Sequence, residues 1–190
     1  MGTKQEHNRV AGDGLNWLLL DLNSFFASCE QQRDPALRGR PVGVVPLLDV
    51  DSTCLLAASR EAKQLGLKTG TSVKEAKRVC RDIVLIKAGH ARYVDYHHKI
   101  LAAVERHVPI DQVLSIDEVA CRLTGSQRDL GNSLALARAI KATIARQVGE
   151  CLTCSIGLAP SRLVAKMASD MRKPDGLVAL LPGDVPHALY

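Results

Sequence analysis

The chain has 190 residues, of which 46% are hydrophobic, 24% are charged and only 3% are aromatic. This composition is typical of one globular domain or two small ones, and it argues against disordered, collagen-like and membrane-spanning classes. The formal net charge of +5 makes a nucleic acid or another polyanion a candidate partner.

The N-terminus and the cysteines indicate a reducing compartment. Residues 1–14 are polar and lack the apolar stretch of a signal peptide, so we expect a disordered lead-in and a cytoplasmic protein. The six cysteines are scattered, which suits free thiols better than a disulfide framework. Cys151 and Cys154 form a single C-x-x-C pair, which cannot close a tetrahedral zinc site, so we expect this pair to be structural.

The expected elements begin with a buried strand over 15–21. A helix follows it through Glu30, and Asn23 or Ser24 is the candidate residue to cap that helix. Four short elements come next: a strand at 42–45, a helix ending near Gly66, a helix from Ser72 to Cys80 and a strand at 83–86. Glycine suits the end of the first of these helices because it readily adopts a left-handed backbone.

The second half of the chain alternates long helices with strands. Amphipathic helices are predicted over about 92–107 and 130–148, where apolar residues recur at helical spacing. The other expected elements are strands at 112–116, 119–123 and 152–158, a helix at 161–172 and an apolar segment at 177–181. The order of the main elements is βαββαβ, an α+β fold of the ferredoxin-like type, with residues 23–88 inserted after the first strand.

Three acids fall where this topology would gather them. Asp21 ends the first strand, and Asp117 and Glu118 lie between the second and third strands. The first and third strands are neighbours in such a sheet, so the three carboxylates should share one patch and repel one another unless a cation is present. Carboxylates of this kind suit Mg²⁺, and a pair of such ions serves phosphoryl transfer. The alternative is structural: Asp21 begins a helix and the other two acids form a turn.

Four segments resemble motifs of the Y-family (translesion) DNA polymerases, in that family's order. They are DLNSFFASCE at 21–30, ASREAK at 58–63 with Gly66 and Gly70, SIDE at 115–118, and CSIGLAPS at 154–161 followed by AKMASDM at 165–171 and KPDG at 173–176. The resemblance runs from about residue 15 to residue 181. Each match alone is weak, but four matches in the order of the family are specific. The chain therefore resembles the palm and fingers of this family.

The resemblance implies a domain layout and an activity. Residues 15–22 and 89–181 would form the palm, 23–88 the fingers, and 182–190 the start of a thumb that is otherwise missing. The implied reaction is template-directed transfer of a dNTP to a primer 3′-hydroxyl, of the lesion-bypass type. The implied partners are primer–template DNA, a dNTP and a sliding clamp reached through a missing C-terminal region. The expected location is cytoplasmic, with nucleoid association when DNA is bound.

The resemblance also assigns site residues. The catalytic carboxylates would be Asp21, Asp117 and Glu118, which together with the carbonyl of Leu22 would hold two Mg²⁺ ions, with Mn²⁺ as a substitute. The nucleotide would meet the backbone N–H groups of Ser24 and Phe25, the ring of Phe26 as a steric gate against a ribose 2′-hydroxyl, and the cations Arg60, Lys63 and Lys173. Arg60 stands where many members carry a tyrosine, so its contact with the triphosphate would be ionic.

Charge placement supports a phosphate-binding segment. Residues 60–81 contain seven basic and two acidic residues, so this segment alone carries the net charge of the whole chain, +5. A basic segment suits triphosphate and template phosphates, although a solvated helix face would look the same.

Two other functions remain open at the level of sequence. The chain ends at Tyr190, where the thumb of the family would begin, so a catalytically inactive DNA-binding fragment or scaffold is one alternative. Another nucleotidyl transferase or cyclase built on a palm fold is the second. The fingers motif and Phe26 argue against that second alternative.

Overall fold

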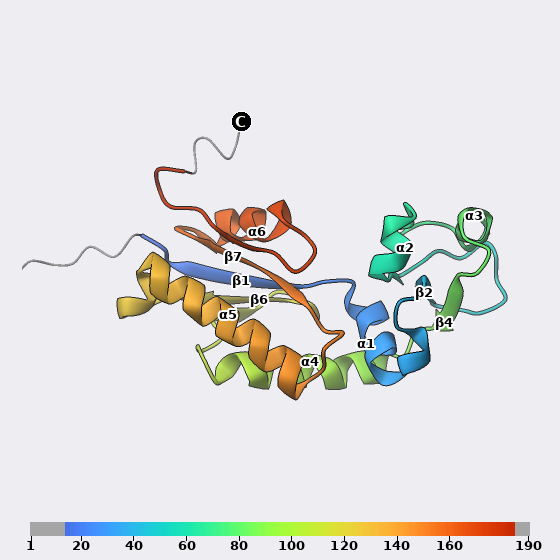
Figure 1. Ribbon diagram of the computed structural model, residues 1–190, viewed down its shortest axis with the longest axis horizontal. Coiled ribbons are helices and arrows are strands. Elements are labelled where there is room, and N and C mark those ends of the chain that lie inside the picture. The colour runs from blue at the N-terminus through green and yellow to red at the C-terminus, as the bar shows by residue number, and fades with distance from the viewer. Residues whose placement is uncertain (1–13, 185–190) are drawn as a thin grey trace, which may run out of the picture.

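The computed structural model describes residues 14–184. Residues 1–13 of the expected lead-in and residues 185–190 of the expected thumb segment lie outside the described part of the chain. Figure 1 shows a larger sheet with helices on both faces, and a smaller sheet at the far side of helix α1. Within residues 14–184, no helix is long and apolar enough to cross a membrane.

The larger sheet has five strands in the order β5-β6-β1-β7-β8. Their bounds are β1 Trp17–Leu22, β5 Gln112–Val113, β6 Glu118–Arg122, β7 Cys154–Ala159 and β8 Leu177–Ala179. The central strand β1 is antiparallel to both β6 and β7, and β8 joins the edge parallel to β7. The predicted first and third strands of the βαββαβ pattern, β1 and β6, are therefore adjacent as expected. The apolar segment at 177–181 supplies a fifth strand, β8.

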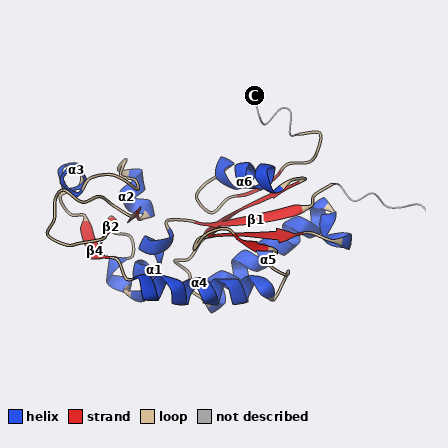
Figure 2. Cartoon of the chain, turned by 180° about the vertical axis from the view of Figure 1, so that it is seen from behind, coloured by secondary structure: helices blue, strands red, loops and turns tan. Residues whose placement is uncertain are grey.

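Helices cover the larger sheet on both faces. Helices α4 (His90–Glu105) and α5 (Leu130–Gln147) lie on one face, and α6 (Arg162–Met171) lies on the other (Figures 1 and 2). A short 3-10 helix, Gly125–Arg128, precedes α5. The three helices begin and end within two residues of their predicted bounds, because their apolar periodicity is strong.

Alternate side chains of β1 supply two separate cores, as the period of a strand requires. Leu18 and Leu20 enter the main core with side chains of α4 and α5 such as Tyr93 and Ile140. Leu19 points the other way, into a small cluster beneath α6 formed with Ala159 and Ala165, and Trp17 packs against that cluster. The guanidinium of Arg122 lies over the Trp17 ring, 4.7 Å from its centroid.

The smaller sheet has three strands in the order β3-β2-β4. Its elements are β2 Val42–Val45, β3 Ala57–Ala58, α2 Arg60–Gln64, α3 Val73–Val79 and β4 Val84–Lys87. The side chain of Ser72 caps α3, as predicted, and Gly66 follows α2 with a φ of +86°. This region has its own apolar core around Leu55 and Val73.

Helix α1 (Phe25–Arg33), followed by the 3-10 helix Pro35–Leu37, joins the two sheets. Phe25, Ala27 and Cys29 belong to the main core, together with Val44 of β2 and Ala57 of β3. One continuous apolar core thus runs from the larger sheet through α1 to the smaller sheet.

One predicted strand is shorter than expected. The strand expected over 112–116 ends at Val113. The chain turns there, because the N–H groups of Leu114 and Ser115 both donate to the carbonyl of Glu118. Residues 114–117 therefore form a loop that ends beside β1.

Candidate functional site

The predicted acids Asp21 and Glu118 are directly opposite each other in the larger sheet. Asp21 is the fifth residue of β1 and pairs in register with Glu118, the first residue of β6. The residue Asp21 is only 5% exposed. Two carboxylates held at one position of an antiparallel pair repel each other, so their negative charge requires a compensating cation.

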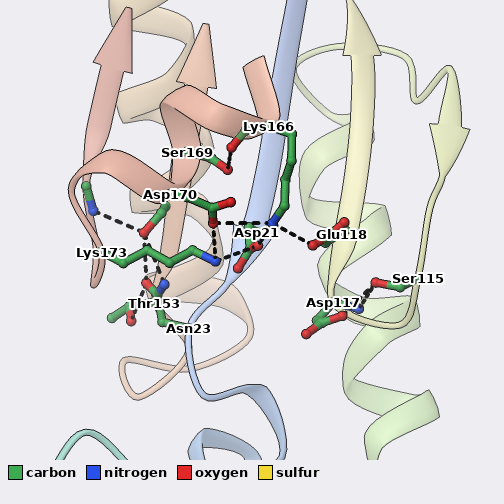
Figure 3. Close-up of polar contacts among 12 residues, drawn as sticks. Asp21, Asn23, Ser115, Asp117, Glu118, Thr153, Lys166, Ser169, Asp170 and Lys173 are labelled. Carbon is green, nitrogen blue, oxygen red and sulfur yellow. Dashed lines mark hydrogen bonds and ion pairs between the residues drawn. The ribbon is translucent and has the colours of Figure 1, made fainter. Parts of the chain in front are cut away.

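Lys166 supplies that cation. Its Nζ lies between the two acids, in contact with Oδ2 of Asp21 and 2.7 Å from Oε1 of Glu118 (Figure 3). Partial burial by itself would lower the pKa of Lys166, but its hydrogen bonds and charge contacts with the two carboxylates outweigh burial and raise this pKa. The side chain therefore remains an ammonium ion at neutral pH. Sequence reasoning placed Lys166 in a motif but gave it no role.

A second lysine and a third acid extend the ion-pair network. Lys173 Nζ is 2.7 Å from Asp21 Oδ2 and 2.7 Å from Asp170 Oδ1, and Lys166 Nζ is 3.3 Å from the same oxygen of Asp170. Partial burial of Asp170 would raise its pKa, but the contacts with Lys173 and Lys166 outweigh burial and hold the pKa below its ordinary value. Lys166 and Asp170 are spaced four residues apart on one face of α6, and Lys173 lies just beyond the end of this helix.

The carboxylate of Asp117 stands apart from this network. Its Oδ1 accepts a 2.6 Å hydrogen bond from Ser115 Oγ (Figure 3). Its backbone carbonyl accepts from the N–H of Leu22 at 2.9 Å. His97 Nδ1 lies 2.8 Å from the carbonyl oxygen of Ile116 and so ties the loop to α4. The fold thus brings the backbone of Asp117 to the end of β1 but directs its carboxylate to Ser115.

The donor set fits a divalent cation in chemistry, although the three acids do not converge. Among the described residues, no group of three His, Cys, Asp or Glu side chains is close enough to hold a metal ion. Asp21 and Glu118 offer hard oxygen ligands at one point, and the ammonium of Lys166 already occupies the position of a cation between them. A metal at this point therefore needs Lys166 to move, and a third carboxylate ligand needs Asp117 to leave Ser115.

The loop between β1 and α1 is organised by Asn23 rather than by a conventional helix cap. Ser24, one of the two expected caps, takes the N-cap position of α1 with a φ of +49°, but its side chain makes no cap hydrogen bond. The Asn23 side chain instead donates to Ser155 Oγ and accepts from Thr153 Oγ1 and from the N–H of Asp175. This amide ties the end of β1 to the loop that carries Lys173.

The predicted gate residue Phe26 lies against α4. Its ring stacks on the ring of Tyr93, whose hydroxyl donates a 2.8 Å hydrogen bond to Glu30 Oε1. Glu30 is 1% exposed and is also held by Arg92 at 2.8 Å. Burial raises the pKa of Tyr93 to about 12, so its hydroxyl remains a donor. The sequence placed Tyr93 within the amphipathic helix expected over about 92–107, and nothing in the spacing revealed its link to Glu30.

Two cavities lie around the start of α1. The larger, about 560 Å³, is lined in part by Ser24, Arg60, Lys63 and Lys173. The smaller, about 330 Å³, is lined in part by Ser24, Phe25, Phe26, Lys63 and Asp117. All six residues predicted to bind a nucleotide thus line one cavity or both. Burial and the like charge of Lys173 lower the pKa of Lys63, against an opposing effect of Asp21.

Comparison with known proteins gives a family and close relatives. A sequence profile described as the impB/mucB/samB family matches residues 20–170. DNA polymerase IV of Moorella thermoacetica is 43% identical over 174 residues, which are 91% of this chain and 43% of that protein. DNA polymerase IV of Pelotomaculum thermopropionicum is 40% identical over 173 residues, covering 91% of this chain and 42% of that protein.

Solved structures with the same fold are also DNA polymerases. A Y-family DNA polymerase chimera matches with a TM-score of 0.83 at 27% identity, over 91% of this chain and 51% of the chimera. DinB from Sulfolobus solfataricus matches with a TM-score of 0.82 at 28% identity, over 91% of this chain and 50% of that structure. The chain spans less than half the length of the curated relatives it matches and about half the length of these solved structures.

Proposed function

Because the chain belongs to the impB/mucB/samB family, we propose that it forms the palm and fingers of a Y-family DNA polymerase and carries out template-directed nucleotidyl transfer. The resemblance predicted from four sequence segments is confirmed by the family profile and by the structural neighbours. The relatives named DNA polymerase IV are more than twice as long as the matched region. Their DNA polymerase activity, and with it the lesion bypass implied by the family resemblance, is therefore proposed for this chain.

The observation that supports the proposal most directly is the position of the acids relative to the cations. Asp21 and Glu118 meet at one point of the sheet, and Lys173 connects Asp21 to the larger cavity. Asp117 and Phe26 line the smaller cavity, and Lys63 lines both. Carboxylates for a metal thus adjoin cations for phosphates, the combination that phosphoryl transfer requires.

We assign the domains on this basis. The strand order β5-β6-β1-β7 supports a ferredoxin-like palm over 15–22 and 89–181, with β8 added at its edge. The smaller sheet, with α2 and α3, supports a fingers subdomain within 23–88. The basic side chains Arg60 and Lys63 come from its helix α2 and face the larger cavity.

Asp21, Glu118 and the carbonyl of Leu22 would hold divalent metal ions, with Asp117 as a further ligand once it leaves Ser115. Such ions, Mg²⁺ or Mn²⁺, would lower the pKa of the primer hydroxyl and neutralise charge on the leaving pyrophosphate. The residues of this chain would keep the acids in place through β-sheet register, which sets Asp21 opposite Glu118.

The triphosphate would bind among Lys173, Lys63 and Arg60, with the N–H groups of Ser24 and Phe25 directed at it from the start of α1. The primer 3′-oxygen then forms a bond to the α-phosphorus as the bond to the bridging oxygen breaks. Pyrophosphate leaves and the hydroxyl proton passes to solvent. Phe26 would restrict the space beside the sugar.

The partners follow from the same assignment. Two structural neighbours are described as a post-insertion binary complex and an insertion ternary complex of Dbh DNA polymerase. We propose primer–template DNA and a dNTP as partners of this chain. Binding to a sliding clamp and association with the nucleoid remain predictions from the family resemblance.

Primer extension tests the proposal. The chain, a primer–template duplex, dNTPs and Mg²⁺ are mixed at high enzyme and low salt, with Asp117→Ala as the inactive variant. Asp82→Ala, which removes an exposed acid of the smaller sheet region, is the control. We expect extension by the native chain and by the control, and none by Asp117→Ala. Absence of extension by the native chain, or equal extension by all three proteins, would overturn the assignment.

A further inference from the structure

Lys166 is placed where a metal ion and a lysine cannot both reside. Its Nζ contacts Asp21 Oδ2 and lies 2.7 Å from Glu118 Oε1, so it occupies the point at which these two carboxylates converge. A divalent ion bound by both acids would lie a few ångströms from this ammonium, and like charges at that distance repel strongly. Binding of a metal to the pair therefore requires Lys166 to withdraw.

The fold provides a place for the displaced ammonium. Asp170 lies one helical turn beyond Lys166 on α6, and its Oδ1 is already 3.3 Å from Nζ. The Asp170 side chain is 47% exposed and the Lys166 side chain 31% exposed, so both lie at the rim of the site. A small rotation of the lysine side chain would move its ammonium from Asp21 and Glu118 to Asp170, while the helix backbone stays in place.

We propose that Lys166 is an internal counter-cation of the Asp21–Glu118 pair, which a divalent ion displaces onto Asp170. This inference rests on the proposed function for the presence of a metal at the pair. Lys166 acts as a positioning residue: without metal it keeps two facing carboxylates in register, and with metal it competes for them.

This arrangement has two opposite effects. The ammonium stabilises the metal-free protein, because the buried Asp21 would otherwise face Glu118 with less compensation. The same ammonium weakens the affinity for metal, because it must be displaced first. Affinity for the metal alone is therefore low, and the negative charge of a bound triphosphate would favour metal binding by attracting Lys173 away from Asp21.

The first test measures Mn²⁺ binding in the absence of nucleotide. The electron paramagnetic resonance signal of free Mn²⁺ reports how much of the ion remains unbound. Lys166→Met keeps the length of the side chain and removes the charge. We expect it to bind Mn²⁺ more tightly than the native chain, on the order of tenfold, because a repelling unit charge is lost. Lys99→Met is the matched control, since Lys99 forms an exposed pair with Asp95 one helical turn away. It should leave Mn²⁺ affinity unchanged.

The second test is thermal unfolding in EDTA and in Mn²⁺. Lys166→Met should unfold at a lower temperature than the native chain in EDTA and gain more from Mn²⁺. Lys166→Arg, which keeps the charge, should retain weak Mn²⁺ binding and so separate charge from side-chain packing. Asp170→Asn should weaken Mn²⁺ binding several-fold, because the displaced ammonium loses its acceptor.

Unchanged or weaker Mn²⁺ binding by Lys166→Met would overturn the proposal. So would a gain that persists in the double variant Asp21→Asn, Lys166→Met, because the metal would then lie elsewhere. These readouts need neither primer nor nucleotide. Failure of primer extension with the expected Mn²⁺ result would count against the proposed polymerase and leave the role of Lys166 supported.

Discussion

The ring of Phe26 stacks on the ring of Tyr93, with centroids 4.1 Å apart and planes 13° from parallel. Tyr93 is in turn fixed by its hydrogen bond to the buried Glu30, which lies one helical turn after Phe26 on α1. The position of the Phe26 ring is therefore set by contacts with two helices. A rigid ring at the border of the smaller cavity is what a steric test of the sugar requires.

Removing this ring should relax sugar selectivity. We expect Phe26→Ala to raise the incorporation of ribonucleotides relative to deoxyribonucleotides by at least about tenfold, because space opens for a 2′-hydroxyl. Single-nucleotide kcat/KM with each sugar measures the ratio. Tyr96→Leu removes an aromatic ring of α4 that packs against the same core, and it should leave the ratio unchanged. Equal sugar selectivity in Phe26→Ala and the native chain would exclude Phe26 as the gate.

The charge of Lys63 should contribute to nucleotide binding. Lys63 lines both cavities, whereas Lys74 lies exposed on α3. Lys63→Gln should weaken dNTP binding by about tenfold, the size expected when a charge-assisted hydrogen bond to phosphate is lost. Lys74→Gln should change it by less than about twofold. Titration with dNTP in the presence of Mg²⁺ gives both dissociation constants. A larger loss for Lys74→Gln would place the triphosphate elsewhere on the basic segment.

The close approach of α6 to β7 depends on Gly157. A Cβ atom at this position would overlap the carbonyl oxygen of Ala165 and the backbone nitrogen of Ser169. Gly157→Ala should therefore lower the free energy of unfolding by about 1–3 kcal/mol, the usual cost of overpacking. Gly183→Ala, where a Cβ atom would meet nothing within 4 Å, is the control. Urea unfolding followed by circular dichroism compares the two. Native-like stability of Gly157→Ala would mean that α6 can shift freely.

Stability should decline in alkaline solution because of buried thiols. Burial, with the charges of Asp111 and Glu105, raises the pKa of Cys121 to about 12, and burial raises that of Cys154 to about 12, from an ordinary value near 9. Between about pH 9 and about pH 12, these thiols release their protons in the unfolded chain and keep them in the folded chain. The folded state therefore loses stability as the pH rises through this range. Each thiol contributes a slope of up to about 1.4 kcal/mol per pH unit.

The variant Cys121→Ala should reduce this slope, whatever its effect on stability at neutral pH. Cys54→Ala, at an exposed position, should not change it. The free energy of unfolding is measured by urea titration at intervals from pH 7 to pH 11. Identical slopes for Cys121→Ala and the native chain would show that this thiol already ionises in the folded state.

The sequence predicted the meeting of Asp21 and Glu118, because strand order alone decides which strand ends are adjacent. It did not predict that Asp117 would turn to Ser115, since the direction of a side chain in a loop depends on local hydrogen bonds that no periodicity records. The sequence also did not predict the left-handed backbone of Ser24, because serine rarely adopts this conformation outside a specific tertiary setting.

Lys166 shows what sequence reasoning missed and which signal was present. Its spacing to Asp170 marks a charged face on α6, and the motif placed this helix after β7. The identity of its partners depends on the packing of α6 on β7 at Gly157 and, through it, on β1, a strand far earlier in the chain. Glu30 was missed for a similar reason, because a buried charge in a helix is recognised only when its partners, here Arg92 and Tyr93, are known.

The only tryptophan of the chain, Trp17, packs against the small cluster beneath α6, away from the main core. Its fluorescence therefore reports on one face of the sheet alone, and the cationic Arg122 over its ring makes the emission sensitive to motion of β6. Light emitted by a single native side chain can thus report on the packing of α6, the helix that carries Lys166 and Asp170, without any added label.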